Sequence, residues 1–67
     1  MQVGNLYRFE GTVTMGLYGR VALYLGEAFI HRSDGVTVEN HKVLMVGESS
    51  PTIIDRGLLK HMNEVQA

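Results

Sequence analysis

The chain has 67 residues, a formal net charge of −1 and no cysteine. This length predicts one domain over residues 1–67, and the lack of cysteine excludes disulfides and thiolate zinc sites. A charge this close to zero argues against a protein that coats DNA or binds an anionic membrane through a basic surface. A domain of this size buries only about 60% of its unfolded surface, which leaves a well-packed barrel that stands alone or self-association, and of the two we expect a homo-oligomer.

The composition is that of a folded globular protein. Hydrophobic residues make up 45% and charged residues 19%, and there is one proline, so disorder is not expected. No apolar run approaches the roughly 18 residues of a membrane span, and residues 1–5 lack the features of a signal peptide. We expect a soluble, cytoplasmic protein that does not bind a membrane.

Short apolar stretches separated by glycine, aspartate and asparagine predict strands along most of the chain. We expect strands over residues 3–9, 20–26, 29–33 and 36–46, with a long loop or irregular hairpin arm over 10–19. A bend or bulge is expected near Glu39 and Asn40, where the alternation of side chains shifts. The dipeptide Asp34-Gly35 favours the positive φ angles of a two-residue hairpin turn.

The alternation assigns side chains to faces of the predicted strands. In the first strand Val3, Tyr7 and Phe9 share one side, and Leu6 and Arg8 share the other. In the second, the residues of one face are Val21, Leu23 and Leu25, and those of the other are Ala22 and Tyr24.

The end of the chain predicts a short helix. We expect residues 53–54 to form a brief last strand, after which Asp55 has the character of a helix N-cap. Leu58, Met62 and Val65 fall on one helical face, although an early glycine weakens the helix. We therefore expect a mainly all-β fold, a small five-stranded barrel with a short C-terminal helix.

No motif indicates catalysis, a metal or a cofactor, and we expect none of the three. His31, His41 and His61 lack the spacing of metal ligands, although the turn could bring His31 near residues 37–39. Two Ser/His/Asp sets can be written, without the Gly-x-Ser-x-Gly turn of a hydrolase: Ser33, His31 and Asp34, or Ser49, His41 and Asp55. A chain this short rarely provides the surrounding pocket, so we expect a non-enzymatic protein.

Tyrosines beside arginines are the candidates for binding, because this pair of residue types is typical of interface hot spots. The same tyrosines could instead cap the edge of a small core. We expect exposed anchors and arginine hydrogen bonds at Leu17, Tyr18, Arg20 and Tyr24, followed by Tyr7 and Arg8.

The stretches VGNLYRF and GRVALYLGE, the long loop between them, the Asp-Gly hairpin and the short helical turn together resemble SH3-like small barrels, including KOW-type domains. The chain also looks like short accessory proteins of tailed bacteriophages. The resemblance implies a five-stranded barrel that binds through its long first loop, and a host or virion protein as partner in the host cytoplasm. The lack of tryptophan makes recognition of proline-rich peptides doubtful. The helix is expected to be longer than the single 3₁₀ turn of many such domains.

The sequence thus predicts a protein-binding module that binds or inhibits a host protein. One alternative is a binder of nucleic acid or of a small phosphorylated ligand such as a nucleotide signal, using Arg8, Arg20 and Arg32 for phosphates. Another is a structural or assembly protein that acts as an oligomer.

Overall fold

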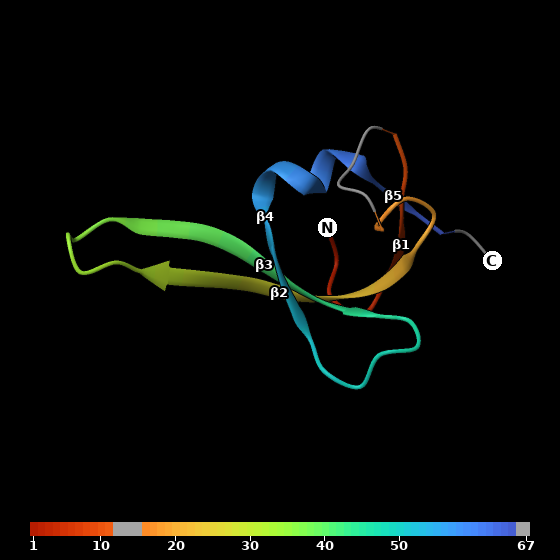
Figure 1. The fold of residues 1–67 in the computed structure, drawn as a ribbon, viewed down its shortest axis with the longest axis horizontal. Coiled ribbons are helices and arrows are strands. Elements are labelled where there is room, and N and C mark those ends of the chain that lie inside the picture. The colour runs from red at the N-terminus through yellow and green to blue at the C-terminus, as the bar shows by residue number, and fades with distance from the viewer. Residues whose placement is uncertain (12–15, 66–67) are drawn as a thin grey trace.

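Five antiparallel strands and one 3₁₀ helix make up the computed structural model, which describes residues 1–11 and 16–65. The elements are β1 (Leu6–Phe9), β2 (Val21–His31), β3 (Thr37–Met45), β4 (Thr52–Asp55), η1 (Arg56–His61) and β5 (Met62–Glu64). They form one sheet in the order β4-β3-β2-β1-β5 (Figure 1). The all-β class is confirmed. Among the described residues β4 and β5 do not pair, so the sheet is not closed into a barrel.

One face of the sheet carries the core. Tyr7 and Phe9 of β1 are buried while Leu6 and Arg8 are exposed, which confirms the predicted alternation there; Val3 is exposed. The rings of Tyr7 and Tyr24 meet edge to face with centroids 6.3 Å apart. The complete buried cluster is Tyr7, Phe9, Ala22, Tyr24, Val43, Met45, Ile54 and Met62, with Leu17, Leu58 and Leu59 packed against it.

The two strands expected at 20–26 and 29–33 are a single strand, β2, with a bulge. Its register against β3 shifts between Tyr24 and Gly26, and Gly26 has a φ of +123°, a conformation that favours glycine. The bulge expected near Glu39 and Asn40 is therefore on the opposite strand. One extra residue in a strand inverts the alternation of its side chains. Each side chain after Gly26 therefore lies on the face opposite to the one expected from continuing the pattern of residues 21–25.

The Asp34-Gly35 turn is confirmed, with three residues in the loop instead of two. His31 pairs with Thr37, and Arg32 N–H donates to the Val36 carbonyl at 2.8 Å. Gly35 has a φ of +88°, and the Gly35 N–H donates to the Arg32 carbonyl at 3.1 Å. This is the three-residue hairpin in which only the glycine needs a left-handed backbone.

The predicted C-terminal helix is present as a 3₁₀ helix and is shorter than expected. Asp55 is its N-cap, with Oδ1 accepting from the Gly57 N–H at 2.8 Å, as predicted. The helix ends at His61 because β1 takes the next residues as a strand partner: Phe9 pairs with Met62. Met62 is thus buried from β5, and the predicted helical face shared with Val65 does not form.

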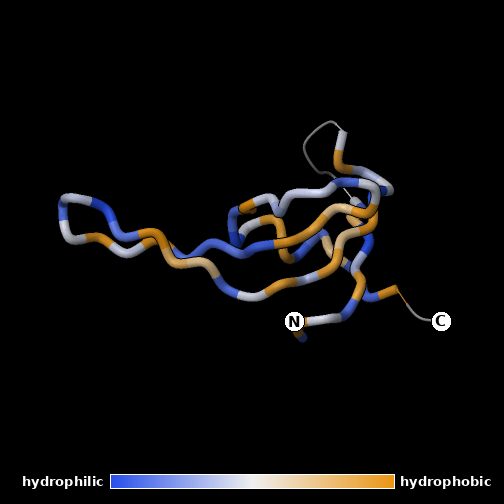
Figure 2. The backbone as a smooth tube through the Cα atoms, turned by 90° about the horizontal axis from the view of Figure 1, so that it is seen from below, coloured by the Kyte–Doolittle hydropathy of each residue, from blue (hydrophilic) through white to orange (hydrophobic). Residues whose placement is uncertain are grey.

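The β2–β3 hairpin extends well beyond the rest of the fold. β4 pairs with β3 only at residues 40–43, and β1 pairs with β2 only at residues 21–23. We call residues 27–39, which lie past these pairings, the arm. It projects along the long axis of a molecule measuring 42 × 24 × 21 Å (Figure 1). Hydrophobic stretches lie along both of its strands, and its tip is hydrophilic (Figure 2).

Candidate functional site

Tyr18 occupies the loop tip at which it was expected. Arg20 N–H donates to the Leu17 carbonyl at 2.9 Å and Gly19 has a φ of +82°, so residues 17–20 form a tight turn with Tyr18 at its corner. The Tyr18 side chain is 70% exposed. Residues 12–15 of the same loop lie outside the described residues.

Tyr7 and Tyr24 are core residues, so the prediction that they present exposed anchors is wrong. Both are buried, and each hydroxyl has a partner inside the fold. The Tyr7 hydroxyl accepts from the Gln2 backbone N–H at 3.0 Å, and the Tyr24 hydroxyl contacts His41. The core-edge alternative for these two tyrosines is the one that the structure supports.

The remaining predicted residues differ in exposure. Leu17 is half-buried and packs against the core, so the prediction that it is an exposed anchor is also wrong. Arg8 is exposed, and Arg20 forms an ion pair with Glu48 at 3.1 Å. An ion pair this exposed contributes little to stability. Of the predicted binding residues, Tyr18 and Arg20 therefore remain together on the turn of residues 17–20, and the other two tyrosines are not part of this surface. We call this turn the Tyr18 corner.

The structure does not bring Arg8, Arg20 and Arg32 together. Arg20 directly precedes β2 and Arg32 directly follows it. An eleven-residue strand spans roughly 35 Å, so the two guanidinium groups lie at opposite ends of the molecule. Arg32 also pairs with Asp34 at the hairpin tip, at 3.2 Å. The predicted three-arginine phosphate pocket is wrong.

A buried hydrogen-bonded chain links Tyr24, His41 and Glu39. The Tyr24 oxygen lies 2.6 Å from His41 Nδ1, and His41 Nε2 lies 2.8 Å from Glu39 Oε2. Tyr24 and His41 are buried, whereas the Glu39 side chain is 38% exposed. The chain therefore runs from the core to a carboxylate at the surface. Nothing in the sequence spacing indicates it, because a strand bulge decides which face each residue takes.

Proton positions along this chain follow from its surroundings. Burial raises the pKa of the Tyr24 hydroxyl, and the nearby carboxylates of Glu27 and Glu39 raise it further, so the hydroxyl keeps its proton. In the neutral imidazole, Tyr24 O–H then donates to His41 Nδ1, and His41 Nε2–H donates to Glu39. Both ring nitrogens of His41 are satisfied, and Glu39 is held in one orientation.

Neither of the two Ser/His/Asp sets is assembled. His41 is fully engaged by Tyr24 and Glu39, while Asp55 caps η1. His31 contacts Thr37 Oγ1 at 3.1 Å, as the turn predicted. Asp34 in turn accepts from the Val36 backbone N–H at 3.0 Å.

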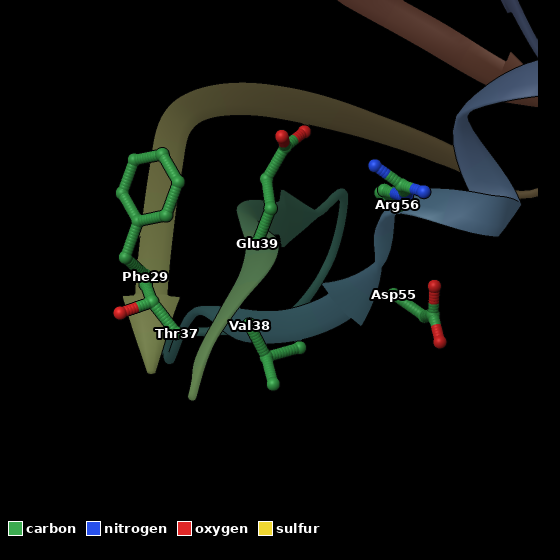
Figure 3. Close-up of a pocket in the computed structure, with 6 residues that line it drawn as sticks. All are labelled: Phe29, Thr37, Val38, Glu39, Asp55 and Arg56. Carbon is green, nitrogen blue, oxygen red and sulfur yellow. The ribbon is translucent and has the colours of Figure 1, made fainter. Parts of the chain in front are cut away.

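An open groove of about 560 Å³ lies where the arm leaves the body, and Glu39 is one of its walls. β4 ends at Asp55, and the chain turns away from the sheet into η1 at Arg56. On the neighbouring strand, residues 37–39 of β3 extend beyond the end of β4. In Figure 3, Glu39 and Arg56 extend to one side of the strands, and Val38 and Asp55 to the other. The groove is lined by Phe29, Thr37, Val38, Glu39, Asp55 and Arg56.

The arm exposes large apolar side chains on both faces. Strand pairing places Phe29 opposite Glu39, and Ile30 opposite Val38 on the other face. The exposed apolar residues of the arm are Phe29, Ile30, Val36 and Val38. Sequence reasoning did not single them out. One signal in the sequence could have found them. Near the Asp34-Gly35 turn, apolar residues occupy strand positions that point to both faces of the sheet, whereas a sheet with one buried face needs apolar residues on that face only.

Both edges of the arm lack a neighbouring strand among residues 1–11 and 16–65. On β2, residues 27–31 pair only with β3, and on β3, residues 37–39 pair only with β2. Unpaired backbone N–H and C=O groups along an edge are a template for another strand. The arm therefore combines apolar side chains with two open edges.

The described part of the chain defines a small all-β domain with a projecting hairpin. Within it, no group of three or more metal-binding side chains is found, and none of its helical segments has the length and apolar character to cross a membrane. Searches against protein-family models, curated proteins and solved structures find no match.

Proposed function

We propose that this protein is a protein-binding module and that the arm, residues 27–39, is its binding element. The observation that carries the proposal is the exposure of Phe29, Ile30, Val36 and Val38 on a hairpin whose two edges are open. A two-stranded hairpin alone is at best marginally stable in water. A partner that covers the arm would bury these side chains and pair an edge, and so would stabilise it.

The rest of the fold provides a rigid base for the arm. The Tyr24–His41–Glu39 chain lies at the point where the arm joins the core, and the groove runs beside it. Fixing a binding hairpin at its base lowers the conformational entropy lost on binding. The exposed Tyr18 corner is a second, smaller contact surface under the same proposal.

The layout also supports the resemblance to SH3-like barrels. The five strands, the long connection between β1 and β2, and the short helix before β5 agree with it, whereas the described sheet is not closed between β4 and β5. A phage origin and a host or virion partner stay predictions, as does an inhibitory action.

Site-specific photo-crosslinking tests the proposal. Ile30 on the arm and Ile53 on β4 are both 47% exposed, so a photoreactive residue at either position has the same access to solvent. In cells that make the protein, position 30 should give a discrete protein adduct, and position 53 should give none or much less. Equal labelling from both positions, or none from position 30, would contradict the arm as binding element.

Polar substitution on the arm is the second part of this test. Replacing Ile30 and Val38 with serine removes apolar side chains that face each other across the two strands. The adduct, followed from a photoreactive residue at position 36, should then be lost. The matched control combines Ile53→Ser with Val46→Ser, which removes one exposed isoleucine and one exposed valine outside the arm and should leave the adduct intact.

A further inference from the structure

We infer that the arm binds a second copy of this chain, by antiparallel pairing of residues 27–31 of β2 with the same residues of the other copy, centred on Phe29. The inference rests on the proposed function, because it names the partner of the arm. It follows from three features of this edge: the direction of its backbone groups, its self-complementary side chains and its freedom from neighbouring elements.

The backbone groups of alternate residues point out of the edge. Arg32 donates from its N–H to Val36 and accepts at its carbonyl from Gly35, so both of its backbone groups face β3. In antiparallel pairing this direction alternates, so Ile30 and Ala28 also face β3, while His31, Phe29 and Glu27 direct their N–H and C=O groups outward. The outward set is centred on Phe29.

A two-fold axis at Phe29 gives a complementary register. Phe29 then faces Phe29 of the other copy, and each such facing pair exchanges two backbone hydrogen bonds. The same register sets Glu27 opposite His31, which matches an acidic side chain with a basic one, and sets the small Ala28 opposite the larger Ile30. Identical surfaces meeting in this way form the closed two-fold interface that is commonest among homo-oligomers.

The opposite edge of the arm suits a second copy less well. Residues 37–39 of β3 lie beside the groove, where Asp55 and Arg56 stand at the start of η1 (Figure 3). A second arm would have to displace these charged side chains. The β2 edge past Gly26 has no neighbour among the strands and helix described here.

In the four-stranded sheet so formed, the arm faces that carry Ile30 and Val38 also become one continuous apolar surface. Ile30 and Val38 pair across the strands of one copy, and Ile30 would meet Ala28 of the other. Cross-strand contacts of this kind are the unit of sheet stabilisation. Because only five residues of each copy pair, the interface is narrow, and we expect a reversible dimer whose population rises with protein concentration.

Analytical ultracentrifugation over a concentration series tests the dimer. The native chain should shift from monomer to dimer as its concentration rises. Phe29→Pro removes an outward N–H without touching the β2–β3 ladder, so it should raise the dissociation constant roughly tenfold or more. Phe29→Ala keeps the N–H and is its matched control; it should dimerise better than Phe29→Pro.

Charge reversal tests the register. His31→Glu sets two carboxylates against each other at both ends of the interface and should weaken the dimer. Adding Glu27→Lys to that variant restores opposite charges and should recover it. Failure of the double variant to recover would overturn this register, provided that circular dichroism shows the same fold in all variants.

A native chain that stays monomeric at every concentration overturns the inference. If position 30 then still crosslinks to a different protein, the proposed function stands without it. If position 30 gives no adduct of any kind, both fail together. A dimer that Phe29→Pro and His31→Glu leave unchanged would also overturn the inference, because it would have to use another surface.

Discussion

The hydroxyl of Tyr24 lies 2.6 Å from Nδ1 of His41, and both side chains are buried where the arm meets the core. Because His41 also holds Glu39 at 2.8 Å, the interior of the domain determines the orientation of a carboxylate in the surface groove. Tyr24 faces the core before the bulge at Gly26, and His41 faces it from β3. This contact therefore joins the body of the sheet to the base of its projecting part.

Removing the Tyr24 hydroxyl should destabilise the fold. Tyr24→Phe leaves Nδ1 of His41 buried without a partner, and an unsatisfied buried group costs about 1 to 3 kcal/mol. Urea denaturation should show this loss in the free energy of unfolding. Tyr18→Phe is the control, because the Tyr18 side chain is 70% exposed and its change should stay within about 0.5 kcal/mol. Equal effects from both variants would contradict the role assigned to the buried contact.

Stability should fall in alkaline solution because of Tyr24. Burial, followed by Glu27 and Glu39, raises the pKa of its hydroxyl above the usual 10.0, so the unfolded chain loses this proton first as pH rises. The contribution is fully present below pH 10.0 and is lost progressively as pH rises towards the folded-state pKa. Melting temperatures measured from about pH 9 to about pH 11 should drop more steeply for the native chain than for Tyr24→Phe. Parallel curves would show that another group causes the fall.

The bulge in β2 should depend on Gly26. Its φ of +123° is unfavourable for any residue with a Cβ, although a Cβ there would meet only Val3 Cγ2, at 3.6 Å. Gly26→Ala should therefore lower the free energy of unfolding by about 1 to 3 kcal/mol through backbone strain alone. Gly57→Ala is the matched control, since Gly57 has no positive φ and should tolerate the change. Thermal melts of the two variants measure the difference.

Asp55 should be needed at the start of η1. Asp55→Ala removes the acceptor of the Gly57 N–H and should cost about 1 kcal/mol. Asp55→Asn retains a side-chain oxygen in the capping position and should lose only a small part of that. If denaturation finds the two variants equally unstable, the charge of Asp55 matters more than the cap.

Local signals in the sequence predicted the local parts of this fold. The apolar alternation of β1, the Asp34-Gly35 turn and the Asp55 cap each depend on residues that are neighbours in the chain, and all three are present. The exposure of Tyr18 followed in the same way from its position between Gly16 and Gly19.

Features that depend on distant pairing were not predictable from those signals. The helix after Asp55 ends early because Met62 pairs with β1, a partner near the other end of the chain. The faces of Tyr24 and Phe29 depend on one bulge residue between them. Residue type alone therefore indicates tyrosine and arginine as binding residues, whereas strand pairing puts Tyr24 in the core and leaves Phe29 exposed.

The pairing of β1 with β5 also bears on the order in which this chain folds. Arg8 and Asn63 face each other although nearly the whole sequence separates them, while His31 and Thr37 are joined by a short turn. Contacts between close neighbours form in about 1 to 10 microseconds, but ends that lie far apart in the chain must first lose the entropy of closing a long loop. The pairing of β1 with β5 is thus among the last to form, and until then the edge of β1 that faces away from β2 stays open to solvent.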